Sequence, residues 1–137
     1  MEKSSKEVVN KLCDEAKKVA ENAYAVYSNF RVGAALITTE GKIFTGANVE
    51  NKSFGLTNCA ERTAIFQCVS QGYRNIKTIV VYTPTETPTA PCGACRQVIS
   101  EFAEDAEIIC ICDTDLKMEG SSKYFLPDSE FPVDLKK

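Results

Sequence analysis

The stretch NCAER at residues 58–62 carries the strongest indication of the fold and chemistry of this chain. It opens a run with helical periodicity, and it places a thiol, a carboxylate and a guanidinium in close succession. A second stretch, PCGACRQ at residues 91–97, starts another helical run and supplies two more thiols. We predict that the three thiols bind one zinc ion per chain and that the carboxylate moves protons beside it. The rest of the chain then serves to hold these two stretches together.

The composition is that of one ordinary globular domain. With 137 residues, 44% of them hydrophobic, the chain can bury one core, and we expect a single domain over residues 1–137. Such a core needs no metal to hold it, so any metal is expected to be functional rather than structural. The formal net charge of −3 argues against a nucleic-acid partner bound by a basic face. No apolar stretch reaches the roughly 18 residues of a spanning helix, so no membrane partner is expected.

Cysteine usage indicates a reducing compartment. There are seven cysteines, an odd number, and no basic start is followed by an apolar run, so we expect a cytoplasmic protein with reduced thiols. There is no histidine, so a zinc site must use thiolates or carboxylates, and a general base must be something other than imidazole. Four cysteines lie in apolar faces or runs and are expected to pack in the core: Cys13, Cys68, Cys110 and Cys112.

Apolar periodicity alternates between the helical repeat and the strand repeat. Helices are expected over residues 6–24, 59–70 and 92–102, with one or two helical turns over 121–126. Strands are expected over residues 31–38, 42–49, 76–82, 107–113 and 116–119. The first two strands meet at a turn containing Gly41 and so form a hairpin. The strand–helix–strand alternation that follows implies an α/β fold with a mixed sheet.

The spacing of three thiols lets them share one ion. Cys92 and Cys95 are three positions apart, which on a helix puts their β-carbons about 5–6 Å apart on one face. Both stand near a helix start, as does Cys59, and the positive end of a helix favours thiolates. Three protein ligands leave one tetrahedral position for water, as in catalytic zinc sites. A CxxC alone fits a redox dithiol or half a zinc ribbon, but CAE with PCxxC is the three-cysteine form of the zinc-deaminase pattern.

Charge and geometry assign roles to the neighbours of the thiols. Three thiolates outweigh one Zn²⁺, so Arg62, and less directly Gln97, could donate hydrogen bonds that draw off charge; the alternative for Arg62 is a surface ion pair. Glu61 follows Cys59 by two residues, which on a regular helix would turn the side chains about 200° apart. We therefore expect the metal to lie beyond the helix end, where Glu61 can take a proton from water. The alternative is a solvated glutamate in the first turn.

By these motifs the chain resembles the cytidine deaminases of the cytidine and deoxycytidylate deaminase superfamily, specifically their short, homotetrameric, three-cysteine zinc type. The likeness extends to residues 27–36, 45–51 and 126–127. It implies one three-layer α/β/α domain with a mixed five-stranded sheet, zinc on the three cysteines and Glu61 as the proton shuttle. The chain departs from the family at Val26, where proline is frequent, at Phe54, where tyrosine is common, and over residues 113–124, which match poorly.

The resemblance also implies how a nucleoside is held. Asn48 and Glu50 would bind the ribose hydroxyls, and Phe30 would pack on the pyrimidine. The backbone at Ala60 would read the base edge, and Phe131 from a neighbouring subunit would help to close the pocket. Other readings stay open: Phe30 could belong to the hairpin core, and the two polar residues could be solvated in a loop.

The expected activity is hydrolytic deamination of cytidine and deoxycytidine to uridine and deoxyuridine with release of ammonia, in pyrimidine salvage. One rival is a deaminase of a related nucleoside such as blasticidin S, or of a base in a polynucleotide; Glu50 would repel a phosphate and so favours a free nucleoside. Another rival is a non-catalytic zinc module, which should show a fourth ligand. A redox CxxC protein would not need Cys59, Glu61 or Arg62.

Overall fold

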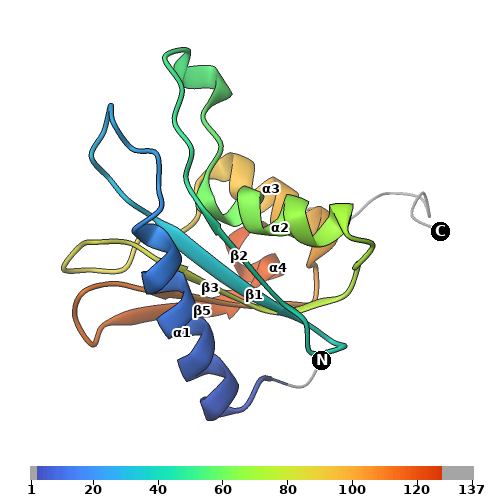
Figure 1. The fold of residues 1–137 in the computed structure, drawn as a ribbon. Helices are drawn as coiled ribbons and strands as arrows, with labels where there is room; N and C mark the ends of the chain where they lie inside the picture. Colours follow the sequence, from blue (N-terminus) through green and yellow to red (C-terminus); the bar gives the residue numbers. More distant parts are fainter. Residues whose placement is uncertain (1–2, 128–137) are drawn as a thin grey trace.

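The computed structural model describes residues 3–127, which are built around a five-stranded sheet of order β2-β1-β3-β4-β5 (Figure 1). The strands are β1 (Gly33–Thr38), β2 (Ile43–Ala47), β3 (Ile76–Tyr82), β4 (Glu107–Ile111) and β5 (Lys117–Ser121). β3 and β4 run parallel, whereas the pairs β1–β2, β1–β3 and β4–β5 are antiparallel. The sheet is therefore mixed, as the sequence predicts.

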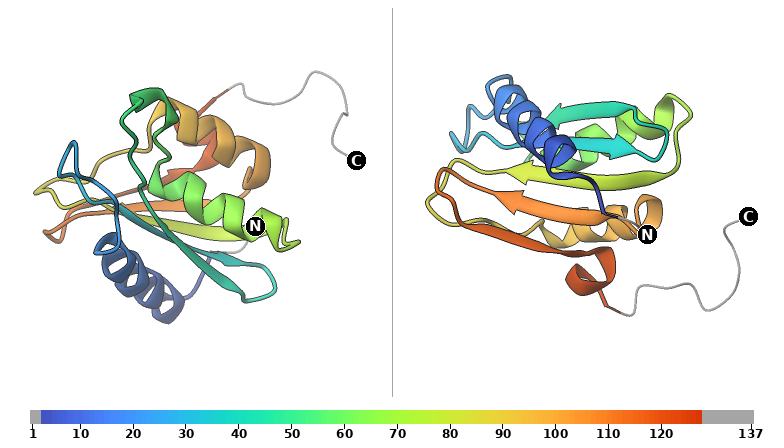
Figure 2. Two further views of the ribbon diagram at one scale, coloured as in Figure 1. Left: turned by 45° about the horizontal axis from the view of Figure 1, so that its top comes forward. Right: turned by 90° about the horizontal axis from the view of Figure 1, so that it is seen from below.

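Helices cover both faces of this sheet (Figure 2). Helix α1 (Lys6–Ala20) lies on one face, and α2 (Ala60–Ser70) and α3 (Gly93–Phe102) lie on the other, where the short α4 (Ser122–Phe125) also packs. A 3₁₀ turn, η1 (Phe54–Leu56), projects from the segment that leads from β2 to α2. The prediction of a three-layer α/β/α arrangement with five strands is confirmed.

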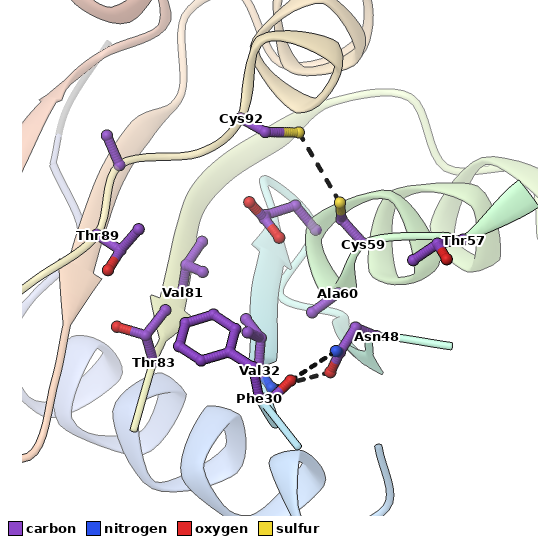
Figure 3. A pocket seen from close by; sticks show the side chains of 12 residues that line it. Phe30, Val32, Asn48, Thr57, Cys59, Ala60, Val81, Thr83, Thr89 and Cys92 are labelled. Carbon is purple, nitrogen blue, oxygen red and sulfur yellow. Dashed lines mark hydrogen bonds between the residues drawn. The ribbon is translucent and has the colours of Figure 1, made fainter. Parts of the chain in front are cut away.

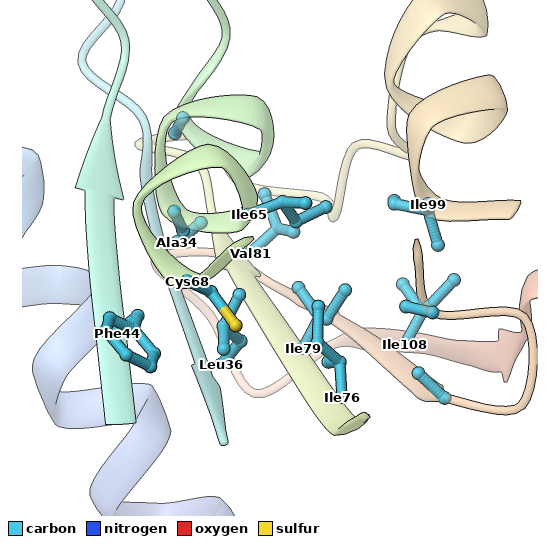
Figure 4. Close-up of a cluster of buried hydrophobic side chains, with 14 of the residues drawn as sticks. Ala34, Leu36, Phe44, Ile65, Cys68, Ile76, Ile79, Val81, Ile99 and Ile108 are labelled. Atoms are coloured by element: carbon cyan, nitrogen blue, oxygen red, sulfur yellow. The ribbon is translucent and has the colours of Figure 1, made fainter. Parts of the chain in front are cut away.

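Successive side chains of the central strand β3 point to opposite faces of the sheet and pack into two separate cores. Ile79 and Val81 point into the core under α2 and α3, where they meet Ile65 and Ile99 (Figure 4). Val80 points the other way, into the core under α1. Because both faces of β3 are buried, the strand reads as a continuous apolar run, and its observed bounds are the predicted ones.

Two glycines let helices approach the sheet closely. A Cβ on Gly46 of β2 would lie 2.4 Å from Ala64 N and 2.8 Å from Ala60 O, both in the backbone of α2. A Cβ on Gly33 of β1 would lie 1.9 Å from Ala16 O in α1. Real Cβ atoms essentially never approach other heavy atoms within 3.0 Å, so only glycine fits either position without a shift. The first contact seats the start of α2, from which the site is built.

Several elements are shorter than the periodicity predicts. Helix α1 ends at Ala20 and not at residue 24, because the chain leaves it to bond beside the end of β2: Tyr24 N donates to Asn48 O at 3.0 Å, and Glu50 N donates to Tyr24 O at 2.8 Å. For the same reason β2 ends at Ala47 and not at residue 49. These tertiary hydrogen bonds override the helical pattern of residues 21–24.

Smaller shifts occur elsewhere. The strand expected over residues 31–38 begins at Gly33, and the one expected over 107–113 ends at Ile111, after which Asp113 N donates to Thr85 O at 2.9 Å. The fifth strand lies at Lys117–Ser121 and not at 116–119. Gly41 has a φ of +92°, as the predicted hairpin turn requires.

Candidate active site

Two helix starts converge on one side of the sheet and bring two cysteines together. Cys59 is the N-cap of α2 and Cys92 the N-cap of α3, each with extended backbone angles rather than helical ones. The helices thus begin one residue later than predicted. Because Cys59 stands outside the regular helix, its sulfur and the Glu61 carboxyl are not forced about 200° apart. The expectation that the site lies beyond the helix end is consistent with this geometry.

The three predicted ligands form one sulfur cluster. Cys59 Sγ and Cys92 Sγ are 3.8 Å apart, and the sulfurs of Cys59, Cys92 and Cys95 all lie within 4.8 Å of one another. Tetrahedral coordination at a Zn–S distance of about 2.3 Å separates two sulfurs by about 3.8 Å, whereas a disulfide needs about 2.05 Å. Within residues 3–127 this trio is the only group of three or more cysteine, aspartate or glutamate ligands close enough to share an ion. The donor set therefore fits a metal with three protein ligands.

Arg62 lies against the cluster, as predicted. Its Nη2 donates a hydrogen bond to Cys59 Sγ at 3.1 Å, and this bond to sulfur is the largest cause of the raised pKa of the guanidinium. Its Nε is buried and has no hydrogen-bond partner among the described residues. The guanidinium is thus placed to draw off negative charge from the sulfurs, and it forms no ion pair with a carboxylate among the described residues.

The cysteine trio concentrates negative charge. A hydrogen bond from Cys95 and, after it, one from Arg62 hold the pKa of Cys59 down to about 5, well below its usual value of 9.0. The same contact with Cys59, together with burial, raises the pKa of Cys95. The surroundings thus favour the ionised form of Cys59, and a negative charge beside two further sulfurs attracts a cation.

Glu61 is buried beside the sulfurs. Its side chain is 5% exposed, which rules out a solvated glutamate in the first turn. Burial, and after it the charge of Cys59, raises the pKa of this carboxyl above its usual value of 4.5. A carboxyl in such a place binds a proton more readily than one in water, which suits a group that must accept and return protons.

A cavity of about 190 Å³ opens in front of the sulfurs and Glu61 (Figure 3). Six predicted site residues line it: Phe30, Asn48, Cys59, Ala60, Glu61 and Cys92. The sequence did not predict the other six lining residues: Val32, Thr57, Val81, Thr83, Thr89 and Ala90. Four of them lie at the end of β3 and in the loop after it. Val81 carried only a core signal, since it lies in a buried strand, and the loop carried no chemical motif.

Phe30 and Asn48 meet at this cavity. Phe30 is 37% exposed and lines the cavity, so it is not a residue of the hairpin core. Asn48 is buried; its Oδ1 accepts from Val32 N at 2.9 Å, and its Nδ2 donates to Phe30 O at 2.8 Å (Figure 3). The amide of Asn48 is thus tied into the protein and is not solvated in a loop.

Besides Cys95 and Arg62, which lie at the sulfur cluster, three predicted residues do not line the cavity or lie outside the described chain. Glu50 is not among the residues that line the cavity, and its carboxylate accepts hydrogen bonds from the turn at residues 27–28. Gln97 is exposed, and its carbonyl accepts from Ser100 Oγ at 2.7 Å, so its role toward a metal stays a prediction. Phe131 lies outside the described residues. No helix within residues 3–127 is long and apolar enough to cross a membrane.

Comparison with known proteins agrees with this geometry. Residues 6–112 match the family model of the cytidine and deoxycytidylate deaminase zinc-binding region. The chain is 55% identical over 94 residues to a cytidine deaminase of Sporosarcina psychrophila, with 69% of each chain covered. It is 46% identical over 124 residues to a probable cytidine deaminase of Dictyostelium discoideum, covering 90% of this chain and 84% of that one.

The fold is also similar to solved structures. The crystal structure of cytidine deaminase from Burkholderia pseudomallei superposes with a TM-score of 0.84 at 48% identity, covering 87% of this chain and 96% of that one. The cytidine deaminase from Mycobacterium tuberculosis superposes with a TM-score of 0.75 at 34% identity, covering 88% and 94%.

Proposed function

Because this chain belongs to the cytidine and deoxycytidylate deaminase family, we propose that it catalyses the hydrolytic deamination of cytidine and deoxycytidine to uridine and deoxyuridine. The observation that carries the proposal is the meeting of three sulfurs and a buried carboxyl at the end of one cavity. That combination offers a cation site and a proton carrier beside a space lined by an aromatic ring. Neither a redox dithiol nor a purely structural metal site needs all three.

One zinc ion per chain would be held by Cys59, Cys92 and Cys95, whose sulfur spacing fits tetrahedral ligation. When bound, zinc supplies a Lewis acid that makes water nucleophilic near neutral pH. Arg62 would keep the negative charge of three thiolates from weakening that effect, because its hydrogen bond draws charge from Cys59. The trio has no fourth cysteine or carboxylate ligand among the described residues, which supports a catalytic rather than a structural ion.

Glu61 would carry the protons of the reaction. It accepts the proton that the attacking water loses as oxygen bonds to C4 of the ring, and it delivers that proton to N3. It then takes the remaining proton of the oxygen now bonded to C4 and transfers it to the amino nitrogen, so that the C4–N bond breaks, the C4 carbonyl forms and ammonia leaves. Its burial supports this role, because a carboxyl with a raised pKa both takes up and releases protons at modest cost.

The substrate would be held by the residues in front of the sulfurs. Phe30 would pack against the pyrimidine, and the backbone of Ala60 would bind the base edge. Asn48 keeps one amide hydrogen and one lone pair beyond those used by Phe30 and Val32, so it can also meet a ribose hydroxyl. Glu50 lies two positions after Asn48 in the sequence, and we propose it as the second ribose ligand.

Assembly into a homotetramer would complete the pocket, with Phe131 of a neighbouring chain closing it. Exposed large apolar side chains support a buried interface on the segments before β1 and before α2: Tyr27, Phe54 and Leu56 are 49%, 74% and 71% exposed, and the rings of Tyr27 and Phe54 are in contact. All seven cysteines are free, and a thiolate metal site needs a reducing environment, which supports a cytoplasmic location. The proposed conversion of cytosine nucleosides would serve pyrimidine salvage. Light scattering on the purified protein would measure the assembly directly.

Ultraviolet-monitored incubation with cytidine, deoxycytidine, adenosine and blasticidin S tests the proposed activity. The two cytosine nucleosides should be converted by zinc-loaded protein, and a chelator that strips the metal should abolish conversion. Conversion of blasticidin S alone would replace the proposed substrate with the antibiotic. No conversion of any cytosine compound by protein with one zinc per chain would refute the proposal.

A further inference from the structure

The backbone of Phe30, the aromatic residue of the cavity, is held on both sides. Its N–H donates to Ser28 Oγ at 3.0 Å, and its carbonyl accepts from Asn48 Nδ2 at 2.8 Å. The second contact is visible in Figure 3, and both Phe30 and Val81 line the cavity. The ring therefore does not hang from a free loop, although residues 26–30 are all exposed.

Ser28 is held in turn by Glu50. Ser28 N donates to Glu50 Oε1 at 3.1 Å, and Ser28 Oγ donates to Glu50 Oε2 in a short contact. A serine hydroxyl has a single hydrogen, and here that hydrogen goes to the carboxylate. The oxygen of Ser28 is then left as an acceptor, which is what the N–H of Phe30 requires. Phe30 N thus donates to Ser28 Oγ, which in turn donates to Glu50, so the three residues are joined in series.

The turn around Ser28 is shaped for this chain of contacts. Asn29, between Ser28 and Phe30, has a φ of +58°, a left-handed conformation that asparagine tolerates better than most residues. Asn29 N donates to Ala25 O at 2.8 Å, and Tyr27 N donates to Glu50 Oε1 at 3.0 Å. The carboxylate thus collects three donors from one turn. Hydrogen bonds to the ionised form are among the causes that lower the pKa of Glu50, that from the Ser28 side chain being the largest.

We propose that Ser28 is a positioning residue for nucleoside binding. Because it is hydrogen-bonded to both Glu50 and the backbone of Phe30, it holds the Phe30 ring in place against the base. The inference rests on the proposed function. It also lets Glu50 serve both the turn and the ligand, because the turn uses three of about four lone-pair positions on the carboxylate and leaves one for a ligand hydroxyl. Loss of the Ser28 hydroxyl should loosen the ring without touching the sulfurs or Glu61.

Steady-state kinetics of Ser28→Ala on cytidine test the proposal. One hydrogen bond of this kind corresponds to a rise in KM of roughly three- to tenfold, with kcat within about twofold of wild type. Ser28→Thr, which keeps the hydroxyl, should restore most of the binding. Ser53→Ala is the matched control, since Ser53 is an exposed serine on the neighbouring loop whose side chain caps nothing.

A double-mutant cycle with Phe30→Leu separates positioning from a general loss of structure. If Ser28 acts through the ring, Ser28→Ala should raise KM in the wild-type background and leave it unchanged in the Phe30→Leu background. An unchanged KM for Ser28→Ala, or the same rise in both backgrounds, would overturn the inference. Wild-type protein that converts no cytosine nucleoside would instead refute the proposed function; binding of uridine by calorimetry would then be compared between the same variants.

Discussion

Replacing Gly46 with alanine tests whether the seat of α2 on β2 sets the geometry of the site. The new Cβ would lie 2.4 Å from Ala64 N and 2.8 Å from Ala60 O, whereas ordinary contacts of a Cβ begin at 3.4 Å. Both neighbours are backbone atoms and cannot rotate away. To restore an ordinary contact, α2 must therefore move outward by about 1 Å at its first turn, and that turn carries Cys59 and Glu61.

The size of the effect follows from this displacement. Overpacking of this kind typically lowers the free energy of unfolding by about 1–3 kcal/mol, which corresponds to a fall in Tm of roughly 3–12 °C for a chain of this length. Misplacement of catalytic groups by about 1 Å lowers the rate by about 100-fold. We expect Gly46→Ala to retain a folded core but to lose about two orders of magnitude in kcat/KM and part of its bound zinc.

Gly33→Ala is the matched control. Its Cβ would lie 1.9 Å from Ala16 O, so it should destabilise the protein at least as much, but it displaces α1 on the face of the sheet opposite the site. Tm from differential scanning fluorimetry, zinc by mass spectrometry and kcat/KM per folded, zinc-loaded chain are measured for both variants. The reasoning would be wrong if Gly46→Ala lowered Tm but left kcat/KM within a few fold of wild type, or if both variants lost activity equally.

Three further predictions concern the sulfurs and their neighbours. Glu61→Gln keeps the shape of the buried side chain but cannot carry protons, so it should retain zinc and lower kcat by roughly 10²–10⁴-fold; activity within tenfold of wild type would contradict the proton role. Arg62→Gln removes the donor to Cys59 and should release zinc at a lower chelator concentration, whereas Arg74→Gln, at an exposed arginine that bonds to backbone carbonyls, should titrate like wild type. The lowered pKa of Cys59, about 5, predicts that after metal removal this thiol is largely ionised from pH 6 upward, so its alkylation rate should stay nearly flat from pH 6 to 8. Cys110 is buried, with a pKa raised to about 12, and should stay unlabelled; a rate at Cys59 that rises tenfold per pH unit would refute the assignment.

Local sequence signals predicted the fold well where one residue's environment follows from its neighbours. The bounds of β3 were correct because a strand buried on both faces needs apolar residues throughout. The starts of α2 and α3 were displaced by one residue, because Cys59 and Cys92 cap these helices instead of joining them. The end of α1 was wrong, because hydrogen bonds to the segment after β2 outcompete further helical turns.

The candidate site divides in the same way. The combination of CAE with PCxxC was enough to predict Cys59, Cys92, Cys95 and Glu61; the fold brings the three sulfurs together and buries Glu61, and the roles of these residues stay predictions. No sequence pattern predicted that Val81 lines the cavity or that Ser28 connects Glu50 to Phe30 by hydrogen bonds. Both depend on residues more than 20 positions away along the chain, whose approach is decided by packing.

The order of amino acids was sufficient to specify the chemical inventory of the chain: which atoms can bind a cation, which group can carry a proton, and which segments alternate between helix and strand. These properties belong to single residues and to their close neighbours. It took the packing of the folded chain to desolvate Glu61, to bond Arg62 to Cys59, and to turn Glu50 toward residues 27–28. Burial and hydrogen-bond geometry depend on how closely the layers pack. That distance is set at contacts such as Gly46 against α2, where the absence of a Cβ atom lets the helix backbone approach the strand.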